Sequence, residues 1–298
     1  MSEPRLTVVV CTHDRPLDLA KCLDALAQLD ASVGVVVVDS ASDPPCASVV
    51  ERYAEAIPGI RYIREDTPGL SRARNRGIRE ARCDLIAFID DDAAPSSSWA
   101  RYIVDAFDGD EAVGCVGGAC IAVFDEASDR PAWLSDRLLQ FAGITRFGVH
   151  AREARSSAEW PFGANIAFRT AALPGDQPFQ TELGRIGSNL LSGEEWALVE
   201  SVRSAGWKIW LEPRAAVAHT VHSERCESRY YWRRLWWAGV TRARSTNAAT
   251  RLALRLIGAA PVRLCLYAVT RDRVYLYRTA ETAGYLAERA RLLLRTAP

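Results

Sequence analysis

An apolar run that ends in three consecutive aspartates is the feature that most constrains this chain. Residues 85–89 are all apolar, and Asp90, Asp91 and Asp92 follow at once. Such a run is typical of a strand buried on both faces of a parallel sheet. Adjacent carboxylates repel one another and are costly to bury unpaired. Because Mg²⁺ and Mn²⁺ prefer carboxylate oxygens, we expect a divalent cation here; a loop with three solvated aspartates is the alternative.

Strands and helices alternate through the first half of the chain. Apolar and β-branched runs predict strands at residues 6–11, 33–38, 60–64 and 85–89. Helical spacing predicts helices at 49–56, at 71–81, and after Pro16, where one face carries Leu19, Cys22, Leu23 and Leu26. This alternation implies parallel strands joined by right-handed crossovers, so the fold class is α/β.

The second half of the chain is less regular. Its pattern predicts strands at 115–124, 166–168 and 215–218, and a helix at 193–205 with Trp196, Val199 and Val202 inward. Residues 125–160 are polar and aromatic, which is typical of a long functional loop. From residue 223 onward the sequence is helical and rich in arginine. We expect one domain over 1–222, with halves at 1–114 and 115–222, and a helical extension over 223–298.

Charge is distributed unevenly although the net charge is zero. Residues 225–298 hold fifteen arginines and four acids, a net charge of +11, so residues 1–224 carry −11. The basic region predicts an anionic partner such as a membrane surface or a lipid phosphate. Its long apolar stretches favour helices packed on protein or lipid, so we do not expect nucleic acid. Arg255, Pro261 and Arg263 interrupt the apolar stretch 252–270, and we therefore do not expect it to span a membrane.

The eight cysteines are scattered without a CxxC pair. This pattern indicates neither a disulfide framework nor a zinc site and favours a reducing cytosol. The first five residues are too short and polar for a leader peptide. We expect a cytoplasmic protein, with peripheral association at the inner face of the membrane as an addition.

Several motifs occur in a characteristic order. They are VVVCTHDRP, VVVVDSAS, PGLSRARNRGI, FIDDD, GANIAFR and SGEEWALVESVRSAGWKIWLEPRAAVAH. Over about residues 6–222 the chain resembles the family-2 glycosyltransferases with the GT-A fold. The resemblance implies a Rossmann-like nucleotide-binding half, a mostly parallel mixed central sheet flanked by helices, and here a C-terminal helical extension. Residues 1–114 would then bind the nucleotide sugar and 115–222 the acceptor.

The resemblance also implies a donor pocket. Thr12, His13 and Arg15 would line it, although Thr12 could instead cap a helix. Asp39 would accept a hydrogen bond from the donor's base or ribose, with an ordinary turn aspartate as the alternative. Among the arginines of the helix at 71–81, Arg74 matches the nucleotide-contact position, and its planar guanidinium suits phosphate or carbonyl oxygens.

The metal site is implied by the DxD motif. Asp90 and Asp92 match its two aspartates, Asp91 lies between them beside the donor, and His219 matches a histidine that completes the site in this family. The cation would be Mn²⁺ or Mg²⁺, and imidazole suits Mn²⁺ better. The donor would be a sugar on UDP, GDP or dTDP.

The catalytic base falls where the chain departs from the family. The family has Glu-Asp with aspartate as the base, whereas this chain has Glu194-Glu195. By position the base is Glu195, with Glu194 as the alternative; either could instead favour the helix start through the dipole. Trp133 and Trp160 would wall the acceptor site or lie in the core.

Together these motifs predict a metal-dependent inverting glycosyltransferase that acts on an acceptor hydroxyl. The acceptor would be a polysaccharide, a lipid-linked intermediate or a natural product. One alternative is a nucleotide-sugar-binding protein that has lost catalysis, because the Glu-Glu pair is non-standard. A nucleotidyltransferase is another, but residues 12–16 lack the glycine-rich basic loop that would hold a triphosphate.

Overall fold

The computed structural model describes residues 4–125, 129–145, 147–185, 187, 189–245 and 249–296, which form two compact units. Unit 1 comprises Met1–Val123, Gly143–Gly187 and Glu194–Thr220. Unit 2 comprises Phe124–Ala142, Ser188–Gly193 and Val221–Pro298. Two segments from the middle of the sequence thus group with the C-terminal region. The division at residue 222, and the division of 1–222 into donor and acceptor halves, stay predictions.

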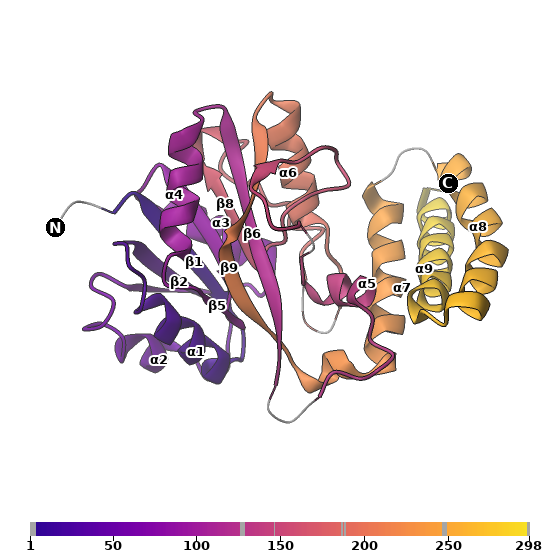
Figure 1. Cartoon of the computed structure of the whole chain (residues 1–298), viewed down its shortest axis with the longest axis horizontal. Coiled ribbons are helices and arrows are strands. Elements are labelled where there is room, and N and C mark those ends of the chain that lie inside the picture. Colours follow the sequence, from indigo (N-terminus) through magenta and orange to yellow (C-terminus); the bar gives the residue numbers. More distant parts are fainter. Residues whose placement is uncertain are drawn as a thin grey trace. The chain divides into compact units, whose positions relative to one another are not determined.

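Unit 1 is built on a mixed sheet (Figure 1). The order of its strands is β3-β2-β1-β4-β8-β6-β9-β5. Its first four strands are parallel: β1 (Leu6–Thr12), β2 (Gly34–Ser40), β3 (Arg61–Glu65) and β4 (Leu85–Asp90). Parallel strands bring their carboxyl ends to one edge. Accordingly Thr12 lies opposite Asp39, and Cys11 lies opposite Asp90.

The other strands run antiparallel to their neighbours where the pairing is described. They are β5 (Ala93–Pro95), β6 (Val113–Phe124), β7 (Arg152–Glu153), β8 (Asn165–Arg169) and β9 (Lys208–Val221). The predicted strand at 215–218 is part of the much longer β9. Ala93 of β5 pairs with His219 of β9, which brings this histidine beside the aspartates that precede β5.

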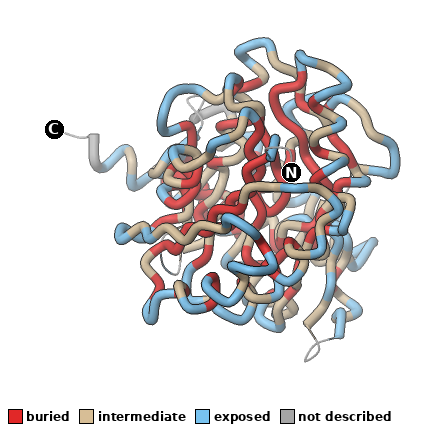
Figure 2. The backbone as a smooth tube through the Cα atoms, turned by 90° about the vertical axis from the view of Figure 1, so that its left-hand side faces the viewer, coloured by how far each residue is buried: buried red, intermediate tan, exposed pale blue. Residues whose placement is uncertain are grey.

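Alternate residues of the central strands contribute to two separate cores. Val8 and Val10 of β1 belong to one buried cluster, and Val9 belongs to the other. The same alternation occurs in β4, where Ala87 and Phe88 lie in different clusters. Figure 2 shows the many buried segments in red. The predicted two-faced burial of these strands, and with it the α/β class, is confirmed.

Helices complete unit 1: α1 (Pro16–Leu26), α2 (Ala47–Glu51), α3 (Leu70–Glu80), α4 (Trp99–Gly109) and α6 (Glu194–Ser204). Helix α1 buries all four residues predicted for its inner face. The helix predicted at 49–56 instead ends at Glu51. Helix α4 was not predicted, although Trp99, Ala100, Ile103 and Phe107 have helical spacing. In α6, Leu198 is buried where Trp196 had been expected, and Trp196 is only half-buried.

Unit 2 contains α5 (Asp136–Leu139), α7 (Ser228–Ser245), α8 (Ala249–Thr270) and α9 (Arg273–Thr296). Figure 1 shows α9 between α7 and α8. Helices α7 and α9 approach very closely, since a Cβ at Gly239 would lie 2.0 Å from the Glu281 carbonyl oxygen. The region 125–160, predicted to be irregular, contains α5, β7 and a 3-10 turn at Gln140–Ala142; its residues 126–128 and 146 lie outside the described residues.

Helix α8 is continuous in spite of Pro261. Its segment Leu252–Thr270 is long and apolar enough to cross a membrane when judged by length and composition alone. Arg255 and Arg263, which argued against such a span, lie within this segment.

Candidate functional site

The three aspartates after β4 differ in environment. The Asp90 side chain is 33% exposed, whereas Asp91 and Asp92 are buried. Thr12 Oγ1 donates a hydrogen bond to Asp91 Oδ2 at 2.8 Å. Arg15 Nη1 lies 3.3 Å from Asp91 Oδ1 and 3.2 Å from Asp92 Oδ2. Burial, aided by the charge of Asp92 and opposed by Arg15, raises the pKa of Asp91 to about 7.

Asp90, Asp92 and His219 form a group that could hold a cation. One ligand atom from each lies within 4.8 Å of the others, among the described residues. His219 is buried, and its Nε2 lies 3.0 Å from Asp92 Oδ1. Gly143 packs against the ring: a Cβ there would lie 2.8 Å from His219 Cε1. Two carboxylates and an imidazole fit Mn²⁺ and accept Mg²⁺, and the partial exposure of Asp90 leaves room for a ligand.

A second acidic pair lies at the start of α6. Arg74 Nη1 is 3.1 Å from Glu194 Oε1 and 3.2 Å from Glu195 Oε1. Burial, together with the charge of Glu195, raises the pKa of Glu194 to about 8. Burial also acts on Glu195, but the charge of Arg74, a backbone hydrogen bond and the charge of Arg185 together outweigh it and hold the pKa of Glu195 below its usual range. The Glu195 side chain is 19% exposed, so it is the ionised and accessible member of the pair.

Arg74 connects the two acidic groups. It is the inward arginine of α3, whereas Arg72 and Arg79 are exposed. Its Nη2 lies 3.4 Å from Asp90 Oδ1, and its guanidinium stacks 5.4 Å from the centroid of the Phe179 ring. The structure therefore places the guanidinium among three carboxylates. The contact with the nucleotide that was predicted for Arg74 stays a prediction.

Neighbouring residues fix this arrangement. Asn75 exchanges two hydrogen bonds with the backbone of Phe179 and so holds that ring under Arg74. A Cβ at Gly163 would lie 2.1 Å from Arg74 Nη2 and 2.5 Å from Glu195 Oε1. Phe179 was not predicted as a member of the site. Gly163 lies in the GANIAFR motif of the predicted acceptor half, but its contact with Arg74 and Glu195 was not predicted. Glycine carries no chemical signal of its own, and its role here depends on which side chains pack against it.

Asp39 and His13 organise the loop beyond β2. Asp39 is buried, and it accepts hydrogen bonds of 2.8 Å each from Ser42 N, Cys46 N and the Tyr62 hydroxyl. Burial opposes its ionisation, but these bonds outweigh burial and lower its pKa. His13 is 47% exposed, and its Nδ1 lies 2.6 Å from the Ser40 carbonyl oxygen. Their contacts with a donor stay predictions.

The two tryptophans considered for the acceptor site have different surroundings. In unit 2, the Trp133 ring lies edge-on to Tyr231 and Tyr277, with centroid distances of 5.6 and 6.3 Å. Trp133 therefore packs in the aromatic core of that unit. Trp160 is half-buried in unit 1, 6.2 Å from the centroid of Phe162.

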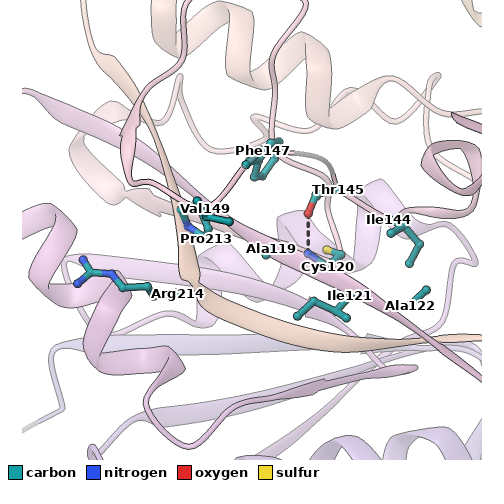
Figure 3. Close-up of a pocket in the computed structure, with 11 residues that line it drawn as sticks. Ala119, Cys120, Ile121, Ala122, Ile144, Thr145, Phe147, Val149, Pro213 and Arg214 are labelled. Carbon is teal, nitrogen blue, oxygen red and sulfur yellow. Dashed lines mark hydrogen bonds between the residues drawn. The ribbon is translucent and has the colours of Figure 1, made fainter. Parts of the chain in front are cut away.

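Unit 1 also has an open hollow with a volume of about 460 Å³. Figure 3 shows residues that line it, which come from β6, from the segment after Gly143 and from β9. The Cys120 amide donates to Thr145 Oγ1 at 2.8 Å across one side. Arg214 is the charged member of the lining, and it binds Glu212 at 2.8 Å. Among the described residues that line it, the hollow offers apolar contact and no carboxylate for acid–base chemistry.

A family model and a related protein both match this chain. The model of glycosyl transferase family 2 matches residues 7–158, just over half of the chain. The glucosyl-dolichyl phosphate glucuronosyltransferase of Haloferax volcanii is 22% identical over 244 residues, which cover 80% of this chain and 76% of that protein.

Solved structures share the fold. The mannosyltransferase PcManGT of Pyrobaculum calidifontis, in complex with GDP-Man and Mn²⁺, matches 100% of this chain and 89% of its own with a TM-score of 0.62 and 20% identity. TarS 1-349 of S. aureus in complex with UDP matches 98% of this chain and 92% of its own with a TM-score of 0.56 and 16% identity. Because the family model matches more than half of this chain, the chain belongs to glycosyl transferase family 2 and is a glycosyltransferase with the GT-A fold.

Proposed function

We propose that the chain is a metal-dependent inverting glycosyltransferase that transfers a sugar from a nucleotide-diphospho-sugar to an acceptor hydroxyl. The observation that carries the proposal is the link through Arg74. Its guanidinium contacts Asp90 of the candidate metal group and also Glu195, the ionised glutamate. A group that binds the donor diphosphate and a group that accepts a proton would thus lie on opposite sides of one arginine.

The donor would bind beside the aspartates. Asp90, Asp92 and His219 would hold Mn²⁺ or Mg²⁺, and a bound cation neutralises negative charge on a departing diphosphate. Thr12 and Arg15 hold Asp91 in place, and with His13 and Asp39 they would surround the nucleotide. The structures of PcManGT and TarS contain GDP-Man and UDP, respectively, which supports a nucleotide-sugar donor of the UDP, GDP or dTDP type.

Glu195 would act as the general base. It would accept the proton of the acceptor hydroxyl while the acceptor oxygen bonds to the anomeric carbon and the bond from that carbon to the diphosphate oxygen breaks. A single displacement of this kind inverts the anomeric centre. Glu194 would stay protonated at neutral pH, since its pKa is about 8. It would position Arg74 instead of taking the proton.

The acceptor and its location are part of the proposal. The Haloferax relative is named for glucosyl-dolichyl phosphate, which favours a lipid-linked acceptor over a free polysaccharide or a natural product. We place the enzyme in the cytoplasm at the inner face of the membrane, in peripheral contact through the arginine-rich region 223–298. Residues 1–114 would bind the donor, and 115–222 the acceptor.

Release of nucleotide diphosphate tests this function. The protein is incubated with UDP-, GDP- and dTDP-sugars and Mn²⁺, with water or a lipid-linked sugar as acceptor. We expect release from one donor class, its loss in EDTA, and its loss in Asp92→Asn. Asp108→Asn is the control, because Asp108 pairs with Arg5 at the surface.

Two results would contradict the proposal. Donor binding without release by the wild-type protein would favour a binding protein. Release of pyrophosphate from a nucleoside triphosphate and a sugar phosphate would favour a nucleotidyltransferase.

A further inference from the structure

Helix α8 turns its more apolar side to solvent. Between residues 252 and 270, its exposed large side chains are all aliphatic apart from Arg255. They are Leu254, Ile257, Val262, Leu264, Leu266 and Val269, with exposures from 38% to 83%. A helix on the surface of a water-soluble protein instead turns its apolar side to the core and its polar side to solvent. The outer face of α8, defined by these six residues, is therefore largely apolar, with Arg255 exposed among them.

The inner face of α8 is already used within unit 2. Leu256 is buried in a cluster with Ala243 of α7 and Tyr285 of α9. Arg263 Nη1 donates to the Arg278 carbonyl oxygen at 3.0 Å and to Thr282 Oγ1 at 2.8 Å. These bonds hold α8 against α9 and keep the outer face turned away from it.

The surroundings of the outer face are positively charged. Residues 249–271 contain four arginines and no acid, and residues 225–298 have a net charge of +11. The acids of α9 are engaged: Glu281 binds Arg242 at 2.9 Å, and Glu288 binds Arg244 at 2.9 Å. Apolar side chains within a basic region fit a surface that presents hydrocarbon and negative charge together.

We propose that the outer face of α8 docks on a lipid bilayer that contains anionic lipids, with the helix lying in the interface. This inference specifies the membrane contact proposed above, but it does not depend on sugar transfer. A second copy of the chain fits less well as the occupant. A two-fold contact through α8 would bring Arg255 and its neighbours together with no acid on the helix to pair them.

Flotation with vesicles tests the proposal on the chain of 298 residues without substrate. The vesicles are phosphatidylcholine alone or with about a third phosphatidylglycerol. We expect binding to the anionic vesicles that weakens with salt, because screening reduces the charge contribution. The double variant Ile257→Glu/Leu264→Glu should bind about tenfold less. Both positions are half exposed, at 50% and 49%, and circular dichroism of the variant checks that its helices are kept.

Leu17→Glu is the matched control, since Leu17 is 79% exposed on α1 of unit 1. It should bind vesicles like the wild type. Equal binding by the double variant, or absence of wild-type binding to anionic vesicles, would overturn the proposal. A wild-type dimer in light scattering that the double variant converts to a monomer would identify a second copy as the occupant. Diphosphate release by the same variants reports separately on the proposed transfer reaction.

Discussion

Glu195 Oε1 lies 3.2 Å from Nη1 of Arg74. The same nitrogen lies 3.1 Å from Glu194 Oε1, so one guanidinium is shared by two adjacent glutamates. Two buried carboxylates cannot both ionise cheaply beside a single cation. The more exposed glutamate keeps the charge, and the deeper one keeps the proton.

This difference predicts opposite outcomes for two conservative substitutions. Glu195→Gln removes the proposed base and should lower kcat by about 10²–10⁴-fold. Glu194→Gln replaces a protonated carboxyl with a neutral amide that still accepts from Arg74, and it should keep kcat within about tenfold of wild type. Steady-state release of nucleotide diphosphate measures both. The reverse order of the two effects would assign the base to Glu194.

Stability should depend on pH through Glu194. Its pKa is about 8 in the folded protein, against 4.5 as its ordinary value, so the folded state holds an extra proton between these pH values. The contribution of Glu194 to the free energy of unfolding is fully present below pH 4.5 and is lost as the pH rises toward 8. Relative to Glu194→Gln, the wild-type free energy of unfolding should fall by up to about 1.4 kcal/mol per pH unit in that window. Urea unfolding of both proteins at pH 5, 6, 7 and 8 spans that window and measures this fall in the free energy of unfolding. If the free energies of the wild type and of Glu194→Gln change with pH in parallel, Glu194 does not have the raised pKa.

The sequence predicts the donor side of the sheet well because that region depends on local patterns. The apolar run at 85–89 became β4, and the order of the motifs identified the family. The inner face of α1 was predicted residue by residue, because helical spacing determines it. These features need no knowledge of distant contacts.

Features that depend on long-range packing were missed or left open. Arg74 and Glu194 are 120 residues apart in sequence, and no local pattern indicates that they meet. The partner of Gly143 is likewise set by the path of a distant strand, β9. Apolar spacing at α8 predicted a helix but not which face would remain exposed. Contacts between distant segments are therefore the features that local sequence patterns do not predict.

Arg74 should be important for stability. Arg74→Met removes the cation shared by Asp90, Glu194 and Glu195 from a buried position and should lower the free energy of unfolding by about 3 kcal/mol. Arg72→Met is the matched control, since Arg72 is exposed on the same helix, and it should change stability by less than about 0.5 kcal/mol. Chemical denaturation at pH 7 compares the two variants. Equal effects would show that the Arg74 network contributes nothing beyond an ordinary surface charge.

Gly143 should position His219. Gly143→Ala adds a methyl group 2.8 Å from His219 Cε1, at a residue with φ +91°. Gly148→Ala is the control: its φ is +85°, but nothing lies within 4 Å of the new Cβ. Both should lose about 1 kcal/mol of stability to backbone strain. Only Gly143→Ala should weaken Mn²⁺ binding, by about tenfold or more in calorimetry, because it displaces a ligand. Equal Mn²⁺ affinities would remove His219 from the metal site.

Gly163 should be required for the alignment of the base. A Cβ at this position would lie 2.1 Å from Arg74 Nη2 and 2.5 Å from Glu195 Oε1, so these side-chain ends must move. Arg74 is held by three carboxylates and by Phe179, and Glu195 is held by Arg74. The methyl group must therefore shift Glu195, and a displacement of about 1 Å can cost 10²-fold in rate.

Gly163→Ala should accordingly lower kcat by about 10²-fold while the binding of nucleotide diphosphate with Mn²⁺ stays near that of the wild type. The expected separation follows from the direct contact of the added methyl with Glu195 Oε1. Asp92 and His219 are not among its nearest atoms, although Arg74 Nη2, which it also meets, faces Asp90. Gly109→Ala at the end of α4 is the control, since nothing lies within 4 Å of its Cβ. Loss of nucleotide binding in step with kcat would mean that Gly163 supports the donor site, and Glu195 would then lose its main structural support as the base.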